Sequence, residues 1–77
     1  MATVLYMLDG CLIASNIQNI GVNSNNGIFI DVIEQRSVEM PIEIHTINFN
    51  LNGEDPESFI LRCALDGFLN LRNYSAT

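Results

Sequence analysis

The sequence predicts an α+β fold: an antiparallel four-stranded, meander-like sheet with one C-terminal helix packed across it. Three observations lead to this prediction. Segments rich in β-branched and aromatic residues fill most of the chain before residue 52, glycine-containing turn sequences separate them, and one segment with helical periodicity follows. The chain has 77 residues, so we expect a single small domain, 1–77, in which hydrophobic burial only narrowly exceeds the loss of conformational entropy.

The first predicted hairpin starts with segment 3–8, which is nearly all apolar and should be a strand covered on both sides. Asp9 and Gly10 follow it, and an Asp-Gly pair readily adopts the positive φ angles of a type I′ turn. The second strand begins at Cys11. Its alternation is lost near Ser15, which indicates a bulge or a short break.

A second hairpin is predicted at residues 23–27, the clearest turn in the sequence. This turn ends in Asn26-Gly27, a further type I′ candidate. Residues 28–34 come next and are apolar on both faces apart from Asp31. Because such a segment fits a sheet with neighbours on both sides, it is predicted to be a central strand.

The fourth strand should begin at Pro41, which cannot donate within a ladder and which follows a polar connection, 35–40. Within 41–52 the apolar residues change from even to odd positions at His45. Because a one-residue slip sends every side chain to the opposite face, a bulge near His45 would keep both sets on the core side. Without a bulge, the strand must bury both faces. The asparagines of this segment are expected to form an outward-facing polar row: Asn48, Asn50 and Asn52.

The helix is predicted over 55–72, and its start is well signalled. Asp55 is a favourable N-cap, Pro56 stands where the first N–H would lack an intrahelical partner, and Glu57 places a carboxylate at the positive end of the helix dipole. The apolar residues span an arc of roughly 200°, whereas packing on a single core requires roughly 100°. We therefore expect a helix that is buried on two sides.

This surplus of apolar surface predicts an interface with a second copy or a partner. A glycine inside a helix costs about 1 kcal/mol relative to alanine, which indicates close packing at Gly67, against the sheet or against a second helix. One face of the sheet also lacks a predicted cover, so either it is an interface or the sheet curls around itself. We expect a homodimer or a higher oligomer, with candidate interface residues Leu61, Ala64, Leu65, Gly67, Phe68 and Leu71.

The charge balance narrows the classes of partner. Lysine is absent, three arginines stand against nine carboxylates, and the formal net charge is −6. Because nucleic acids and anionic membranes are bound mainly through Lys and Arg, neither is expected as a direct partner. A basic protein fits instead. The candidate acidic partner surface comprises Glu34, Glu39, Glu54, Asp55 and Glu57, although helix capping is an alternative explanation for the last three.

The two cysteines, Cys11 and Cys63, are expected to be buried, reduced thiols, since their spacing gives no support for a disulfide. The sequence opens without a charged segment followed by an apolar run, and it contains no apolar stretch long enough to span a bilayer. A cytoplasmic protein that does not enter membranes is therefore expected.

Catalytic motifs are absent from the sequence, which has no glycine-rich phosphate loop, dinucleotide fingerprint or serine elbow. His45 is the only histidine, and together with its same-face neighbour Glu43 it provides too few ligands for a zinc site. Core packing explains Cys11 better than a role as a nucleophile does. We therefore expect no enzymatic activity, no cofactor and no metal.

The leading functional hypothesis is a small, acidic, non-enzymatic protein-binding module that acts as a homo-oligomer. Its size and charge resemble those of compact phage or mobile-element inhibitors of host proteins with basic surfaces. The alternative is an oligomer that binds or sequesters a nucleotide or metabolite in a pocket between subunits. The candidate ligand-facing residues of that pocket are Glu43, His45, Asn48 and Asn50, with Tyr6 or Tyr74 beside them.

Overall fold

A computed structural model describes residues 2–34 and 37–77 of the chain. Across these residues the elements are β1 (Thr3–Leu8), β2 (Cys11–Val22), β3 (Ile28–Glu34), β4 (Glu43–Asn50), α1 (Pro56–Asp66), β5 (Phe68–Asn70) and β6 (Ser75–Ala76). The α+β class is confirmed. The four long strands follow one another as antiparallel neighbours, but two short strands, β5 and β6, extend the sheet beyond the prediction.

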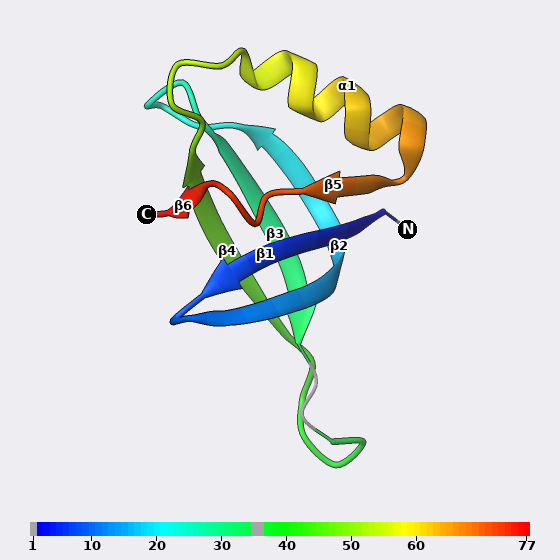
Figure 1. Cartoon of the computed structure of the whole chain (residues 1–77). Coiled ribbons are helices and arrows are strands. Elements are labelled where there is room, and N and C mark those ends of the chain that lie inside the picture. The colour runs from blue at the N-terminus through cyan, green and yellow to red at the C-terminus, as the bar shows by residue number, and fades with distance from the viewer. Residues whose placement is uncertain (1, 35–36) are drawn as a thin grey trace.

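The strand order is β5-β1-β2-β3-β4-β6, and the sheet is mixed because β5 runs parallel to β1. Figure 1 shows that the sheet curls, with the β1–β2 hairpin in front of β3 and β4. The ring of Tyr6 on β1 contacts the ring of Phe49 on β4, although these strands are not neighbours in the sheet. Of the two alternatives for the second apolar face, the curled sheet is therefore the one observed.

The helix begins as predicted and ends earlier than predicted. The Asp55 carboxylate accepts a hydrogen bond from the backbone N–H of Glu57, and Pro56 occupies the first turn. Gly67 then adopts φ +66° and donates its N–H to the carbonyl of Cys63, which closes the helix. The prediction that the helix continues to Arg72 is wrong, because residues 68–70 pair with β1 as β5.

α1 packs over one end of the curled sheet, next to β5 and β2 (Figure 1). Its buried residues are Pro56, Phe59 and Cys63. No helix in the described residues is long and apolar enough to cross a membrane.

The inner face of the sheet carries the core together with the buried side of α1. Val4 and Tyr6 of β1, alternate residues of β3, and Phe49 of β4 are all buried there. Among the described residues, the hydrophobic core cluster comprises Val4, Tyr6, Ile17, Ile28, Ile30, Val32, Phe49, Leu51, Phe59, Cys63, Leu69 and Leu71. Cys63 belongs to this core as predicted, whereas Cys11 is exposed beside the first turn; both thiols are free.

The turns follow from their Asx and Gly residues. Asp9 and Gly10 have φ angles of +50° and +80°, as a type I′ turn requires. The second turn differs from the prediction, because Asn26 has a positive φ and Gly27 does not. Instead, the side-chain oxygen of Asn23 accepts hydrogen bonds from the backbone N–H groups of Asn25 and Gly27, at 3.0 and 2.9 Å.

Two predicted irregularities lie elsewhere or do not occur. The bulge of β2 falls between Ile17 and Asn19, so the strand continues through Ser15 without a break. β4 has no bulge at His45: its pairing with β3 runs without a shift from Ile28↔Phe49 to Glu34↔Glu43. Nor does β4 bury both faces, because Ile44 stays exposed on the outer side.

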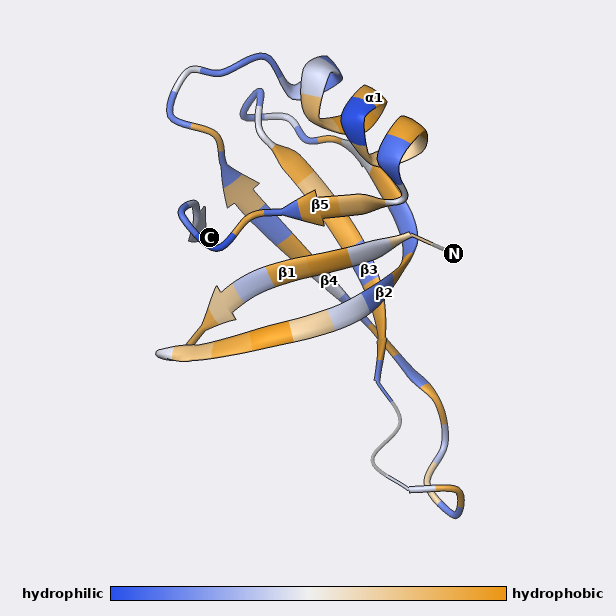
Figure 2. Cartoon of the chain, turned by 45° about the vertical axis from the view of Figure 1, so that its right-hand side comes forward, coloured by the Kyte–Doolittle hydropathy of each residue, from blue (hydrophilic) through white to orange (hydrophobic). Residues whose placement is uncertain are grey.

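The connection between β3 and β4 projects from the body of the molecule, and Figure 2 shows apolar segments on it. We call residues 37–44, which are the described part of this connection and the first two residues of β4, the arm. Its large apolar side chains are exposed: Val38, Met40, Ile42 and Ile44. The predicted polar connection 35–40 falls partly on this arm, and its residues 35 and 36 lie outside the described part of the chain.

Candidate functional site

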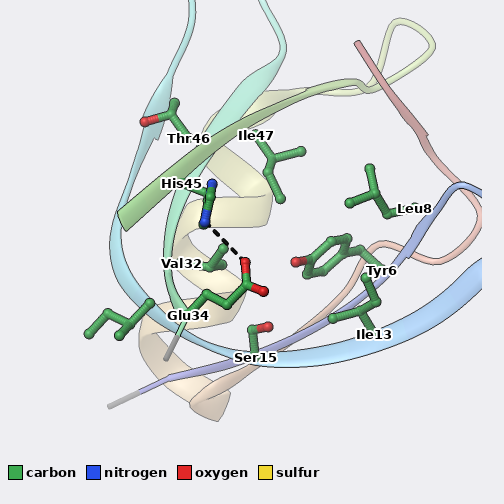
Figure 3. Close-up of a pocket in the computed structure, with 10 residues that line it drawn as sticks. Tyr6, Leu8, Ile13, Ser15, Val32, Glu34, His45, Thr46 and Ile47 are labelled. Atoms are coloured by element: carbon green, nitrogen blue, oxygen red, sulfur yellow. Dashed lines mark ion pairs between the residues drawn. The ribbon is translucent and has the colours of Figure 1, made fainter. Parts of the chain in front are cut away.

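A cleft opens where the curled sheet does not close. β5 pairs with β1 only along Thr3–Leu5, and β6 pairs with β4 only at Phe49–Asn50. In the described part of the chain, the remaining halves of β1 and β4 therefore have no strand paired along their free edges. A cleft of about 520 Å³ lies there (Figure 3), lined by Tyr6, Leu8, Ile13, Ser15, Val32, Ile33, Glu34, His45, Thr46 and Ile47.

One wall of the cleft carries an acidic group of side chains around His45. The pairing Val32↔His45 and Glu34↔Glu43 places these residues side by side where β3 ends and β4 begins. The Nε2 atom of His45 lies 3.0 Å from a carboxylate oxygen of Glu34 and 3.3 Å from one of Glu43. All three side chains are about half exposed, at 45%, 47% and 55%, so the group meets solvent at the mouth of the cleft.

The opposite wall carries the hydroxyl of Tyr6. The Tyr6 side chain is only 3% exposed, and Figure 3 shows its hydroxyl directed into the cleft, toward the side where Glu34 and His45 lie. No residue of the described ranges forms a hydrogen bond with this hydroxyl. Every buried side-chain polar atom of the described residues has a partner, so this unpartnered hydroxyl oxygen is open to the cleft, where a ligand can engage it.

The free edge of β4 borders the same cleft. The backbone N–H of Thr77 donates to the carbonyl of Asn48 at 2.8 Å, so the peptide groups of even-numbered β4 residues point away from β3. By this alternation the N–H and C=O of Ile44 and Thr46 also point outward. Among residues 2–34 and 37–77, no strand pairs with β4 at these two positions.

The predicted ligand-facing residues separate between the two faces of β4. Glu43 and His45 share a face with Phe49, and His45 lines the cleft with Glu43 in contact with it, whereas Asn48 and Asn50 alternate to the other side. The side chain of Asn48 accepts a hydrogen bond from that of Asn23, and the side chain of Asn50 accepts one from the backbone of Asn52. The structure does bring Tyr6 and His45 into one cleft.

The predicted acidic surface also falls into two parts. Glu34 and Glu39 lie at or near the arm, whereas Glu54, Asp55 and Glu57 lie by the start of α1, at the other end of the molecule (Figure 1). Asp55 caps the helix, accepting from Glu57 and from the Ser58 hydroxyl, and Glu54 accepts a hydrogen bond from the Tyr74 hydroxyl. The second part therefore has local structural roles.

The candidate interface residues of the helix region have different environments. Leu61 and Leu65 are exposed on α1, at 60% and 75%, and Phe68 is 44% exposed on β5. Ala64 and Gly67 are also exposed. Leu71 is completely buried in the core, so it cannot contribute to an exposed face.

Ser15 and the apolar wall were not among the predicted site residues. They line the cleft because the β1–β2 hairpin folds over β4. No local sequence pattern predicts that these two parts of the sheet lie close together. The resulting cleft combines one carboxylate, three hydroxyl-bearing residues and aliphatic side chains, which suits a ligand with a polar or cationic head and an apolar stem. Within the described ranges, no three His, Cys, Asp or Glu side chains are arranged to hold a metal ion.

Comparisons with protein-family models, with curated proteins and with solved structures find no match to this chain. The cleft and the edge beside it are therefore the features from which a function can be inferred.

Proposed function

We propose that this chain is a non-enzymatic protein-binding module that takes an extended segment of a basic partner protein as an additional strand along the free edge of β4. The observation that carries the proposal is the pair of outward-directed peptide groups at Ile44 and Thr46, next to a cleft with an acidic wall. An unpaired edge is a template for strand addition, in which main-chain hydrogen bonds give affinity and side-chain pockets give specificity.

The side chains of β4 support this mode of binding. An added strand would have side chains on both faces of the sheet. On the inner face they would meet the cleft, and on the outer face they would meet Ile44 and Ile42, which are 58% and 61% exposed. Burial of these isoleucines against a partner would remove apolar surface from water, at roughly 25 cal/mol per Å².

The charge near the edge favours a basic partner. Glu34 lines the cleft, Glu43 contacts the cleft residue His45, and Glu39 lies on the arm that leads into β4. The chain as a whole is also negative, with a formal net charge of −6. Opposite charge on the partner would accelerate association and disfavour acidic segments, an effect that salt weakens.

A pair of substitutions at Thr46 tests the proposal. Thr46→Pro removes the outward N–H, and proline is tolerated on a strand edge where that N–H faces solvent. Thr46→Val is the matched control, because it keeps the N–H. Both variants lose the 2.5 Å hydrogen bond from the Thr46 hydroxyl to Asp31. The probe is a fluorescein-labelled short peptide with threonine at every second position and valine or lysine at the positions between.

Fluorescence anisotropy should show that the peptide binds the wild type and Thr46→Val alike and binds Thr46→Pro at least about tenfold more weakly, since one lost hydrogen bond costs on the order of 1 kcal/mol and the proline ring also hinders the added strand. Circular dichroism would verify that both variants are folded. Equal affinity of the two variants, or no binding to any of the proteins, would contradict strand addition at this edge.

A second candidate function is the binding of a small cationic metabolite in the cleft, favoured by the unpartnered hydroxyl of Tyr6. Thermal-shift measurements separate the two candidates, because a ligand that binds only the folded state raises the melting temperature. A shift produced by a free metabolite and not by the peptide would favour the second.

Self-association is the other part of the proposal. Exposed leucines on α1 and exposed apolar residues on the arm support it, since both surfaces exceed what one copy of the chain covers.

A further inference from the structure

We infer that the cleft is a recognition pocket for a cation on an apolar stem, namely the side chain of a lysine or arginine in the bound strand. The inference deepens the proposed function and rests on it. It concerns a different part of the site, since the strand edge supplies peptide groups, whereas the cleft would select one side chain of the partner.

The hydroxyl of Tyr6 is the first observation. Tyr6 is only 3% exposed, and its hydroxyl is directed into the cleft. No residue of the described ranges forms a hydrogen bond with this hydroxyl. The ring itself is fixed by its edge-on contact with Phe49. A phenol oxygen that lacks a partner, reaches the cleft and is carried on a fixed, buried ring is a preorganised acceptor for an N–H donor of a ligand.

The charge of the cleft decides which donor fits. Glu34 lines the cleft across from Tyr6, and Glu43 lies within 3.3 Å of the same His45 nitrogen that pairs with Glu34. An anionic ligand would be repelled by both carboxylates. An ammonium or guanidinium group would be attracted, and its N–H donors would form charge-assisted hydrogen bonds, which are stronger than neutral ones.

The remaining walls fit the stem. Leu8, Ile13 and Ile47 provide aliphatic surface on the way to the polar end of the cleft, and the volume of about 520 Å³ accommodates a side chain of this length. Lysine and arginine side chains commonly lay their methylene groups along apolar surface and place the charge at a polar site. Ser15 offers a second hydroxyl near Tyr6 (Figure 3).

The test uses fragments of such side chains, titrated into the isotopically labelled full chain and followed by amide chemical shifts. The cationic probes are n-butylammonium and n-butylguanidinium, and the controls are n-butanol and pentanoate. Saturable shifts are expected at Tyr6, Ser15 and His45, with both cations binding at least about tenfold more tightly than n-butanol, because hydrogen bonds to charged groups contribute more than neutral ones. Pentanoate should bind more weakly than n-butanol.

Two variants assign the selectivity. Glu34→Gln keeps the shape of the side chain and should abolish the preference for the cations over n-butanol. Tyr6→Phe keeps the ring contact with Phe49 and should weaken the binding of both cations several-fold, whereas Tyr74→Phe, whose hydroxyl lies outside the cleft, should leave it unchanged. Equal binding of n-butanol and the cations, or an unchanged preference in Glu34→Gln, would overturn the inference.

The outcomes also distinguish the inference from the proposed function. If the lysine-containing peptide and a glutamate-containing counterpart both bind and both depend on the N–H of Thr46, strand addition stands and the cation pocket fails. If the fragment cations bind as expected but neither peptide does, the pocket stands as a site for free amines and strand addition fails.

Discussion

The ring of Tyr6 packs edge-on against the ring of Phe49, with centroids 5.9 Å apart and planes inclined at 77°. These residues lie on β1 and β4, which are separated in the sheet by β2 and β3. The contact therefore spans the interior of the curled sheet and joins its two open halves. It also fixes the direction of the Tyr6 hydroxyl, so the same contact serves the core and the cleft.

Substitution Phe49→Leu should lower the free energy of unfolding by about 1 kcal/mol or more, because it removes an aromatic pair worth roughly 0.5–1.5 kcal/mol and leaves unfilled volume in the core. Urea denaturation followed by circular dichroism measures the change. Phe68→Leu is the control: Phe68 is 44% exposed, so its replacement should change the stability much less. Equal losses in the two variants would show that the Tyr6–Phe49 contact does not hold the sheet together.

Gly67 makes the transition from α1 to β5 at φ +66°. Substitution Gly67→Ala should cost roughly 1–2 kcal/mol of stability, since a side chain disfavours this left-handed conformation. Space is not the cause, because a Cβ atom at this position would meet no other atom within 4 Å. Asp66→Ala, one residue earlier in the helix, should cause no loss, because it removes a negative charge from the negative end of the helix dipole. A neutral Gly67→Ala measured by urea denaturation would contradict the capping role.

Tyr74 links stability to alkaline pH. Its hydroxyl donates a hydrogen bond to Glu54, and this bond, with smaller contributions from burial and from the Glu54 charge, raises the pKa of Tyr74 above its ordinary value. Because the folded-state pKa is the higher one, the stabilisation is complete below about pH 10 and is lost as the pH rises through the folded-state value.

Tyr74→Phe should therefore flatten the decline of unfolding free energy between neutral and strongly alkaline pH, while keeping the edge-on ring contact with Phe59. Burial also raises the pKa of the Cys63 thiol, which acts in the same direction, but this effect is common to both proteins and cancels in their difference. Parallel pH profiles of wild type and variant would contradict the role of the Tyr74–Glu54 hydrogen bond.

Self-association is tested by size-exclusion chromatography with light scattering. The wild type should elute as a dimer or larger assembly at micromolar concentration, and Leu65→Lys should shift it toward the monomer if the exposed side of α1 forms the contact. Ile42→Lys provides the same test for the arm, where Ile42 is 61% exposed. A wild-type protein that is monomeric throughout would remove the oligomer from the proposal.

Local sequence signals predict much of the fold. Asp9-Gly10 determines a turn and Asp55-Pro56 a helix start through interactions within a few residues, so the first hairpin and the start of the helix are found where they are predicted. The predicted helix end is wrong because the sequence pattern treats Gly67 as an interior position that allows close packing, whereas Gly67 is the C-cap. Leu69 and Leu71 continue the helical periodicity, yet both are buried in the core beyond the helix.

The site could be predicted only in part, because it is formed by strands that are far apart in the sequence and come together in the fold. His45 and Tyr6 were both candidates, but the cleft exists because β1 folds over β4, and that depends on the curl of the whole sheet. The parity change at His45 predicts either a bulge or a strand buried on both faces, because both alternatives hide the isoleucines of this segment. Ile42 and Ile44 instead remain exposed beside the free edge.

Amide hydrogen exchange at Ile44 and Thr46 tests strand addition most directly. In the free protein both N–H groups point outward from the edge of β4 and should exchange fast, whereas the N–H of His45 and Ile47, directed toward β3, should exchange slowly. Saturation with the lysine-containing peptide should slow exchange at Ile44 and Thr46 by at least about tenfold, since both would then donate to the added strand. Saturable binding that leaves the exchange of these two amides unchanged would contradict the account.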